Sequence, residues 1–258
     1  MPKMADDEIR AVLFDLGDTI LDFGRIKTTR CFLEGAKSSH AFLKEHGQPI
    51  GSFLWYFLRN LVRLRIKFLL SDILRRDFDS LEVFRKVGAR QGVHLSLEQW
   101  EQFAWLLYEP LSRQARIEEG LPQTLGALTG MGLKLGIVSN TFVNRASLER
   151  HLQQLGLLDF FAVQLYSYEF GFRKPSAEIF RIAAEKIGAP AEKIVFVGDR
   201  IDNDIRPALN TGMSAVLKKA YTNAGKPTPP GAWRIQKLSE LPGVVQQINA
   251  GAAQPARA

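Results

Sequence analysis

The 258-residue chain contains a single cysteine, Cys31, and no run of about 18 uninterrupted apolar residues. One cysteine cannot form an internal disulfide, which excludes the disulfide-stabilised scaffolds and fits a reducing compartment. Because a long apolar run is missing, no helix is expected to span a membrane. Residues 1–10 are polar and lack the apolar segment of a signal peptide, so we expect a cytoplasmic location.

The sequence also has little concentrated charge. Lys and Arg together number 34 and Asp and Glu number 27, which gives a net charge of +7 that is scattered along the chain. Since no recognised nucleic-acid-binding motif accompanies this charge, we expect no nucleic-acid partner, and a modest positive field favours small anionic substrates. The hydrophobic fraction of 46% is ordinary for a globular protein, and the length predicts one large domain or a core with an insert.

Short apolar runs alternate with amphipathic stretches over much of the chain. Five runs are predicted strands, at 11–14, 133–138, 162–166, 193–197 and 214–217. The stretches between them predict helices at about 122–131, 143–155, 176–188 and 203–211. This alternation indicates an α/β fold, with a Rossmann-like parallel sheet and helices on both of its faces.

Residues 22–116 interrupt this alternation with helix-period patterns and almost no strand signal. The strongest pattern begins at Phe53, and two further helices are expected over 81–91 and 97–107. We therefore predict an all-helical cap domain inserted after the first strand. The predicted organisation is a core of 1–21 and 117–250, a helical cap of 22–116 and a flexible tail of 251–258.

Cationic side chains gather in the long cap helix and directly after it, at Arg59, Arg63, Arg65, Lys67, Arg75 and Arg76. Three interpretations stay open: a solvated face, a surface for phosphate or carboxylate groups, and docking to a membrane surface. The same helix carries an aromatic set, Phe53, Trp55, Tyr56 and Phe57. We interpret these rings as cap core or as a dimer contact, so the partner expectations include a homodimer.

Polar residues follow three of the predicted strands. Asp15 follows the first strand, Ser139 ends the second and Asp199 follows the fourth. In parallel α/β sheets, ligands bind beyond the carboxyl ends of the strands. We therefore expect these three side chains to meet at one edge of the sheet and to form the functional site.

Four separated segments carry a family resemblance. In chain order they are Phe14-Asp-Leu-Gly-Asp-Thr19, Ile137-Val-Ser-Asn140, Arg173-Lys-Pro175 and Val197-Gly-Asp-Arg-Ile-Asp-Asn-Asp204. Each segment is short, but together and in this order they resemble the four motifs of the haloacid dehalogenase-like (HAD) hydrolase superfamily. The resemblance covers about 11–24 and 117–250, and it implies a helical, C1-type cap between the first and second motifs.

The resemblance implies a nucleophile and a metal site. Asp15 would attack phosphorus and form an aspartyl-phosphate, and a carboxylate suits this role because it is already ionised at neutral pH. Asp15, Asp199 and the backbone carbonyl of Gly17 would bind Mg²⁺, a hard cation that takes oxygen ligands. The implied cofactor is therefore Mg²⁺, which would also offset the repulsion between Asp15 and an anionic phosphate.

The resemblance also implies residues that bind and neutralise the phosphoryl group. Ser139 and the amide of Asn140 would bind its oxygens, and Lys174 would stabilise the charge on the nucleophile and the phosphate. Asp204 is expected to orient Lys174 through a charge-assisted hydrogen bond. The neighbours that remain alternatives for this orienting role are Asp202 and Asn203.

One position departs from the family pattern. Family phosphatases usually carry a second Asp two residues after the nucleophile, which protonates the leaving oxygen and later activates water, whereas this chain has Gly17 there. General acid–base catalysis typically contributes about 10²–10⁴-fold to the rate. Three interpretations stay open: a substrate with a good leaving group such as an acyl phosphate, a replacement by Asp18, a cap residue or water, and binding with slow turnover.

These patterns predict a Mg²⁺-dependent phosphatase that acts on a small phosphorylated metabolite through an aspartyl-phosphate on Asp15. Because of Gly17, a catalytically weak phospho-ligand-binding or interaction protein is the alternative from another class. A 2-haloacid dehalogenase is a minor alternative, since family dehalogenases usually have an aromatic residue where this chain has glycine.

Overall fold

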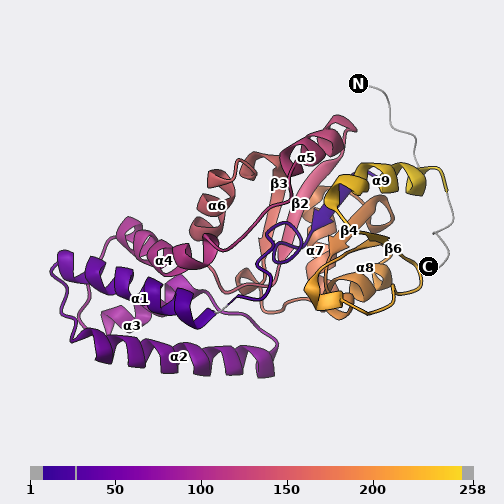
Figure 1. Cartoon of the computed structure of the whole chain (residues 1–258). Helices are drawn as coiled ribbons and strands as arrows, with labels where there is room; N and C mark the ends of the chain where they lie inside the picture. The colour runs from indigo at the N-terminus through magenta and orange to yellow at the C-terminus, as the bar shows by residue number, and fades with distance from the viewer. Residues whose placement is uncertain (1–7, 27, 252–258) are drawn as a thin grey trace.

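The computed structural model describes residues 8–26 and 28–251, and its centre is a six-stranded parallel sheet (Figure 1). The spatial order of the strands is β3-β2-β1-β4-β5-β6. This order starts in the middle of the sheet and winds outward in both directions, as in Rossmann-like folds. The strands are β1 (Ala11–Phe14), β2 (Lys134–Ser139), β3 (Phe161–Tyr166), β4 (Ile194–Gly198), β5 (Ser214–Lys218) and β6 (Ala232–Ile235).

Both faces of the sheet are buried. In β1 all four residues are inaccessible to solvent, with Val12 and Phe14 in one apolar cluster and Ala11 and Leu13 in the other. The first cluster takes residues from α5 (Leu121–Gly130), α6 (Arg145–Gln154) and α9 (Leu241–Asn249), and the second from α7 (Ala177–Ile187) and α8 (Arg206–Asn210). Continuous burial of this kind is typical of parallel strands that have helices on both sides.

Short helical turns connect these elements. Five are 3₁₀ turns, at Leu158–Phe160, Ser167–Glu169, Ala191–Lys193, Tyr221–Asn223 and Leu238–Glu240. A π-helical turn, Ile201–Ile205, stands between β4 and α8. Such turns are rare and occur frequently at functional sites, and this one carries Asp204.

Five helices stand between β1 and β2 in the described chain, and the first four of them form a layer beside the sheet (Figure 1). These four are α1 (Thr28–Glu45), α2 (Phe53–Leu74), α3 (Ser80–Ala89) and α4 (Leu97–Ser112). Their shared apolar cluster contains the buried side chains of Trp100 and Phe103. The helices α1 and α4 approach closely at Gly35, where an added Cβ would lie 2.6 Å from the carbonyl oxygen of Leu107. We call these four helices the helical unit.

The five predicted strands are confirmed, with bounds that differ by at most one residue from the sequence pattern. The pattern does not predict β6, a four-residue strand whose apolar sequence is interrupted by Arg234. The guanidinium of Arg234 donates to the carbonyl oxygen of Lys226. It also misses α9 and extends one helix over 203–211, where the structure has the π turn followed by the five-residue α8. Of the predicted tail, residues 252–258 lie outside the described residues.

Within residues 8–26 and 28–251, no helix combines the length and apolar character that crossing a bilayer requires.

Candidate active site

Asp15 and Lys174 meet at the carboxyl edge of the sheet although they are 159 positions apart in the sequence. Asp15 directly follows β1, and its backbone N–H donates to the carbonyl oxygen of Val197 at 2.8 Å, which extends the pairing of β1 with β4. The Lys174 ammonium donates to Oδ1 of Asp15 at 2.6 Å, and both residues are buried. The parallel topology thus brings the predicted nucleophile and the predicted cation into direct contact.

Asn140, directly after β2, holds the backbone of Lys174 from two sides. Its side-chain carbonyl accepts from the Lys174 N–H at 2.9 Å, and its side-chain amide donates to the Lys174 carbonyl at 2.8 Å. Lys174 therefore enters the site on a fixed loop, ahead of Ser176, which caps α7 by accepting from the Glu178 N–H. In this structure the Asn140 side chain positions the lysine, while the sequence resemblance assigns its backbone amide to phosphate binding.

Asp204 contacts the other side of the same ammonium group, with its Oδ1 2.7 Å from the Lys174 Nζ. The second oxygen of Asp204 accepts from the Arg200 N–H at 2.9 Å, which fixes the carboxylate within the π turn. Gly198 makes room for this carboxylate, since a Cβ there would lie 2.5 Å from the Asp204 Cβ. Among the alternatives for orienting the lysine, Asp202 points away and forms an exposed ion pair of 2.6 Å with Arg206.

Asp199 is braced by hydroxyl and amide groups. Thr19 donates to its Oδ1 at 3.4 Å, and the hydroxyl of Thr222 donates to its Oδ2. The side-chain amide of Asn223 donates to the backbone carbonyl of Asp199 at 2.8 Å. Thr19 belongs to the first sequence motif, whereas Thr222 and Asn223 follow β5 and carry no motif by which the sequence could identify them.

Asp15, Asp199 and Asp204 offer oxygen atoms that all lie within 4.8 Å of one another, and all three residues are buried. Burial raises the pKa of each carboxyl group, to about 6 for Asp199 and for Asp204. The ammonium of Lys174 is the cation in contact with this group, so three crowded acids face one positive charge. A buried carboxylate cluster of this kind could hold a divalent metal ion.

These residues line a cleft of about 570 Å³. Ser139 ends β2 and lines the cleft together with Asn140, and Asn203 lines it together with Asp204. The helical unit contributes Tyr108 and Leu111 of α4. The cleft is therefore lined by every predicted site residue, together with apolar side chains such as Leu111.

Gly17 and Asp18 also line the cleft, but they differ in what surrounds them. A Cβ added at Gly17 would meet no heavy atom within 4 Å. Asp18 has a positive φ of 57°, and its Oδ1 accepts from the N–H groups of Phe23 at 3.1 Å and Gly24 at 3.2 Å. The Asp18 carboxylate thus stabilises the loop after β1, while the position where the family carries an acid is open space.

Tyr108 of α4 links the helical unit to the sheet core through a buried side chain. Its hydroxyl lies 3.0 Å from Nδ1 of His151 on α6. Burial lowers the pKa of His151 to about 4, so this histidine is neutral near pH 7. The contact is therefore a neutral hydrogen bond between the helical unit and the core, and the sequence alone does not predict it.

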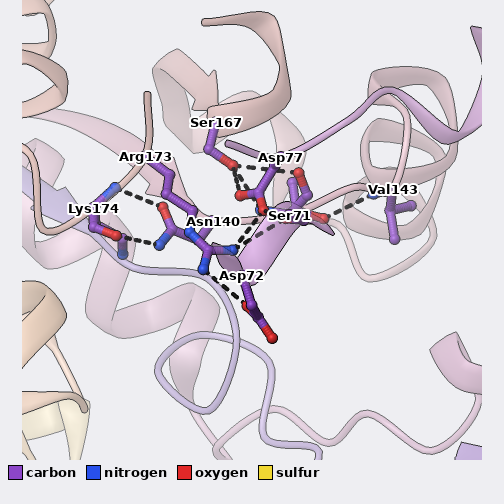
Figure 2. A network of polar contacts seen from close by, with 9 residues as sticks. Ser71, Asp72, Asp77, Asn140, Val143, Ser167, Arg173 and Lys174 are labelled. Carbon is purple, nitrogen blue, oxygen red and sulfur yellow. Dashed lines mark hydrogen bonds and ion pairs between the residues drawn. The ribbon is translucent and has the colours of Figure 1, made fainter. Parts of the chain in front are cut away.

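A second link surrounds Arg173, the residue before Lys174, and is drawn in Figure 2. Its guanidinium donates to Asp77 at 2.8 Å and to Asp72 at 2.9 Å, both at the C-terminal end of α2 or just beyond it. Asp77 also accepts from the hydroxyl of Ser167, which in turn accepts from the Thr141 N–H at 2.9 Å. This network ties α2 to the loops that follow β2 and β3.

Comparison with known proteins shows the family of the chain. The model of the haloacid dehalogenase-like hydrolase family matches residues 9–212, and the chain belongs to that family. A glyceraldehyde 3-phosphate phosphatase of Methanocaldococcus jannaschii is 36% identical over 128 residues, which are 49% of this chain and 55% of that protein. The alignment thus spans about half the length of this curated relative, and other such relatives are matched over 39–53% of their length.

Two solved structures match the fold over nearly the whole chain. A HAD phosphatase of Thermococcus onnurineus has a TM-score of 0.58 and 26% identity, covering 92% of this chain and 98% of that one. A 2-haloacid dehalogenase of Pseudomonas syringae pv. Tomato has a TM-score of 0.55 and 25% identity, covering 93% of this chain and 99% of that one. Since proteins named for two different reactions share the fold, the choice of reaction depends on the residues of the cleft.

Proposed function

We propose that the protein is a phosphatase that transfers the phosphoryl group of a small organic phosphate to Asp15 and then to water. The observation that carries this proposal is the Lys174 ammonium held 2.6 Å from Asp15 and 2.7 Å from Asp204 in the lining of the cleft. This arrangement keeps an anionic nucleophile ready beside a fixed positive charge. The relatives that are named phosphatases support the same reaction class.

In the first step, an Asp15 carboxylate oxygen attacks phosphorus, the P–O bond to the leaving group breaks, and the leaving oxygen takes the electron pair and then a proton. Lys174 stabilises the negative charge on the transferred group, and the hydroxyl of Ser139 with the backbone amide of Asn140 binds its oxygens. In the second step, water attacks the acyl phosphate on Asp15, which releases inorganic phosphate and restores the carboxylate.

The residues present fit a divalent cation. Asp15, Asp199 and Asp204 form a buried, oxygen-rich group that a single lysine does not neutralise. We propose that Asp15, Asp199 and the carbonyl of Gly17 hold Mg²⁺, since Asp204 is already engaged by Lys174 and by the Arg200 N–H. When bound, Mg²⁺ supplies positive charge that offsets the repulsion between Asp15 and the phosphate.

The open space at Gly17 supports a restricted choice of substrate. Because the Asp18 carboxylate is bound by two backbone amides, it is poorly placed to serve as the missing acid. We propose that water supplies the proton and that the protein therefore favours phosphates whose leaving oxygen needs no acid, such as acyl or aryl phosphates. The helical unit would act as the cap that covers this substrate, with Tyr108 and Leu111 as its contacts.

A catalytically weak phospho-ligand-binding protein is the second candidate, and the absence of an acid at Gly17 favours it. Phosphatase activity on an aryl phosphate and an alkyl phosphate, each with Mg²⁺ and with chelator, separates the two. The proposed function requires Mg²⁺-dependent phosphate release from the aryl ester that Asp15→Asn abolishes. Binding of inorganic phosphate without turnover of either ester would identify the binding protein instead. Release of halide from a 2-haloacid in chelator would identify a dehalogenase.

A further inference from the structure

The side of α2 that points away from α1 exposes an unusual amount of apolar surface. Eleven large apolar side chains stand out as exposed in the described residues, and nine of them belong to this one helix, with exposed fractions between 42 and 69%. We call them the outer face of α2: Leu54, Trp55, Leu58, Val62, Ile66, Leu69, Leu70, Ile73 and Leu74. Contiguous exposed apolar surface on a protein usually marks a docking site.

The outer face is continuous along the helix. Leu58, Val62 and Ile66 follow one another at intervals of four residues, so they lie above one another on one side. The opposite side of α2 packs on α1 through Tyr56, whose hydroxyl lies 2.8 Å from the Ser39 hydroxyl, and through Phe57. The helix therefore uses one apolar side to join the helical unit and leaves a second apolar side on the surface. Figure 1 shows α2 along the outer edge of this unit.

Cationic side chains border the outer face. Arg59, Arg65 and Lys67 are exposed, and Arg65 lies next to Val62 and Leu69 at helical spacings of three and four. The acidic residue of α2 is Asp72, which is bound to the Arg173 guanidinium at 2.9 Å. The border of the apolar strip is thus positive along its middle, from Arg59 to Lys67, and the nearby Glu82 carboxylate of α3 is paired with Lys86 at 2.6 Å.

This charge decides between two occupants of the outer face. If two copies of α2 paired through it, each positive border would face the positive border of the other copy in both the parallel and the antiparallel arrangement. A bilayer with anionic lipids instead places phosphate groups beside the arginines and lysine, and acyl chains beneath the apolar strip. A helix of 22 residues is about 33 Å long and can lie along such a surface without crossing it.

We propose that the outer face of α2 docks on a membrane surface that contains anionic lipid. The helix lies in the interface, with its apolar strip below the headgroups and with Arg59, Arg65 and Lys67 among the lipid phosphates. This proposal does not depend on the proposed function, because the docking residues lie outside the cleft.

Co-sedimentation of the full chain with vesicles tests the proposal. The probes are vesicles of phosphatidylcholine alone and vesicles of phosphatidylcholine mixed with phosphatidylglycerol, at low and high salt. We expect at least roughly tenfold more bound protein on the anionic vesicles, with the difference shrinking as salt screens the charges. Equal binding to both kinds of vesicle, or none to either, would overturn the proposal.

Two sets of variants assign binding to this helix. The triple change Leu58→Ser, Val62→Ser and Ile66→Ser should abolish sedimentation, and Arg59→Gln with Arg65→Gln and Lys67→Gln should weaken it on anionic vesicles only. The matched controls, which should bind as the unaltered chain does, are Leu97→Ser on α4 and Lys37→Gln with Lys44→Gln on α1, all exposed positions.

Three further measurements keep the result interpretable. Circular dichroism and the melting temperature show whether each variant is folded. If the serine variant does not fold, the glutamine variant alone decides whether α2 binds the vesicles. Light scattering measures the mass in solution. A dimer that the serine variant dissociates, without vesicle binding by the unaltered chain, would show that a second copy covers the outer face and would refute membrane docking.

Discussion

Asp204 and Lys174 form an ion pair of 2.7 Å in which the two side chains are only 1% and 2% exposed. Burial alone would lower the pKa of the Lys174 ammonium, but the carboxylates of Asp15 and Asp204 reverse this effect and hold it above its usual value. The lysine therefore keeps its positive charge although its side chain is buried. Asp204 acts on the reaction through this lysine, which makes it a positioning residue.

Asp204→Asn should lower kcat by roughly 10²–10³-fold, a loss comparable to the removal of one charge-stabilising group from an active site. The same change should move the alkaline limb of the pH–rate profile to lower pH, because Lys174 loses one of the two charges that raise its pKa. The pH–rate profile with an aryl phosphate measures both effects. Asp202→Asn, in the same turn but on the surface, is the control. An equal loss of kcat in that variant would show that Asp204 does not act by positioning Lys174.

Asp15→Asn should reduce turnover by at least about 10³-fold, because it removes the group that would divide the reaction into two easier steps. The folded state should persist, since asparagine has nearly the same shape as the aspartate. Phosphate release and the melting temperature are the two measurements, with the exposed neighbour Asp22→Asn as the matched control. Unchanged turnover in Asp15→Asn would show that another residue is the nucleophile.

Gly17→Asp should increase turnover of an alkyl phosphate by about 10²–10⁴-fold, the usual contribution of a general acid–base group. An aryl phosphate should gain far less, because its leaving oxygen needs little help from a proton. A Cβ at this position would meet no heavy atom within 4 Å, so the new side chain can leave the backbone without a clash. Gly17→Asn fills the same volume without a titratable group, so an equal gain in that variant would contradict an acid–base explanation.

The Asp199 contribution to stability in chelator should fall as the pH rises from about 4 to about 7, while His151, whose pKa burial lowers to about 4, contributes in the opposite direction. Burial raises the pKa of Asp199 to about 6, above its ordinary 3.8, so the native state binds more protons than the unfolded chain in this window. Loss of that proton destabilises the native state by about 2–3 kcal/mol at most.

Urea unfolding at several pH values, with and without Mg²⁺, measures this slope. Relative to the unaltered chain, Asp199→Asn should make the stability in chelator rise more, or fall less, between about pH 4 and about pH 7, because asparagine has no proton to lose. Added Mg²⁺ should raise stability most at neutral pH, where the carboxylates are ionised. A slope that neither the substitution nor Mg²⁺ alters would show that Asp199 does not contribute to it.

The position of the site follows from the sequence because a parallel sheet brings strand ends together. Asp15, Ser139 and Asp199 each stand where an apolar run stops, and Lys174 precedes a helix that packs against the same sheet. Once the strands are known to run parallel, their carboxyl ends lie at one edge of the sheet, and these side chains meet at that edge. The short motif segments then indicate which chemistry this edge supports.

Other parts of the site depend on contacts that no local pattern records. Thr222 braces Asp199 from a 3₁₀ turn after β5, and its position depends on how the chain leaves that strand. Arg173 binds Asp77 only because α2 ends beside the third motif. The outer face of α2 is similar: the periodicity of the sequence shows an apolar helix, but not which of its two apolar sides is covered.

The vacant space beside Gly17 affects the lifetime of the phosphorylated protein as well as the choice of substrate. Without a carboxylate there to activate the incoming water, an acyl phosphate formed on Asp15 should be hydrolysed slowly. The protein would then spend much of each cycle carrying a phosphoryl mark, which intact-mass spectrometry of a rapidly quenched reaction would detect. Asp15 would then stay phosphorylated for a time after the protein has reacted with a phosphorylated compound.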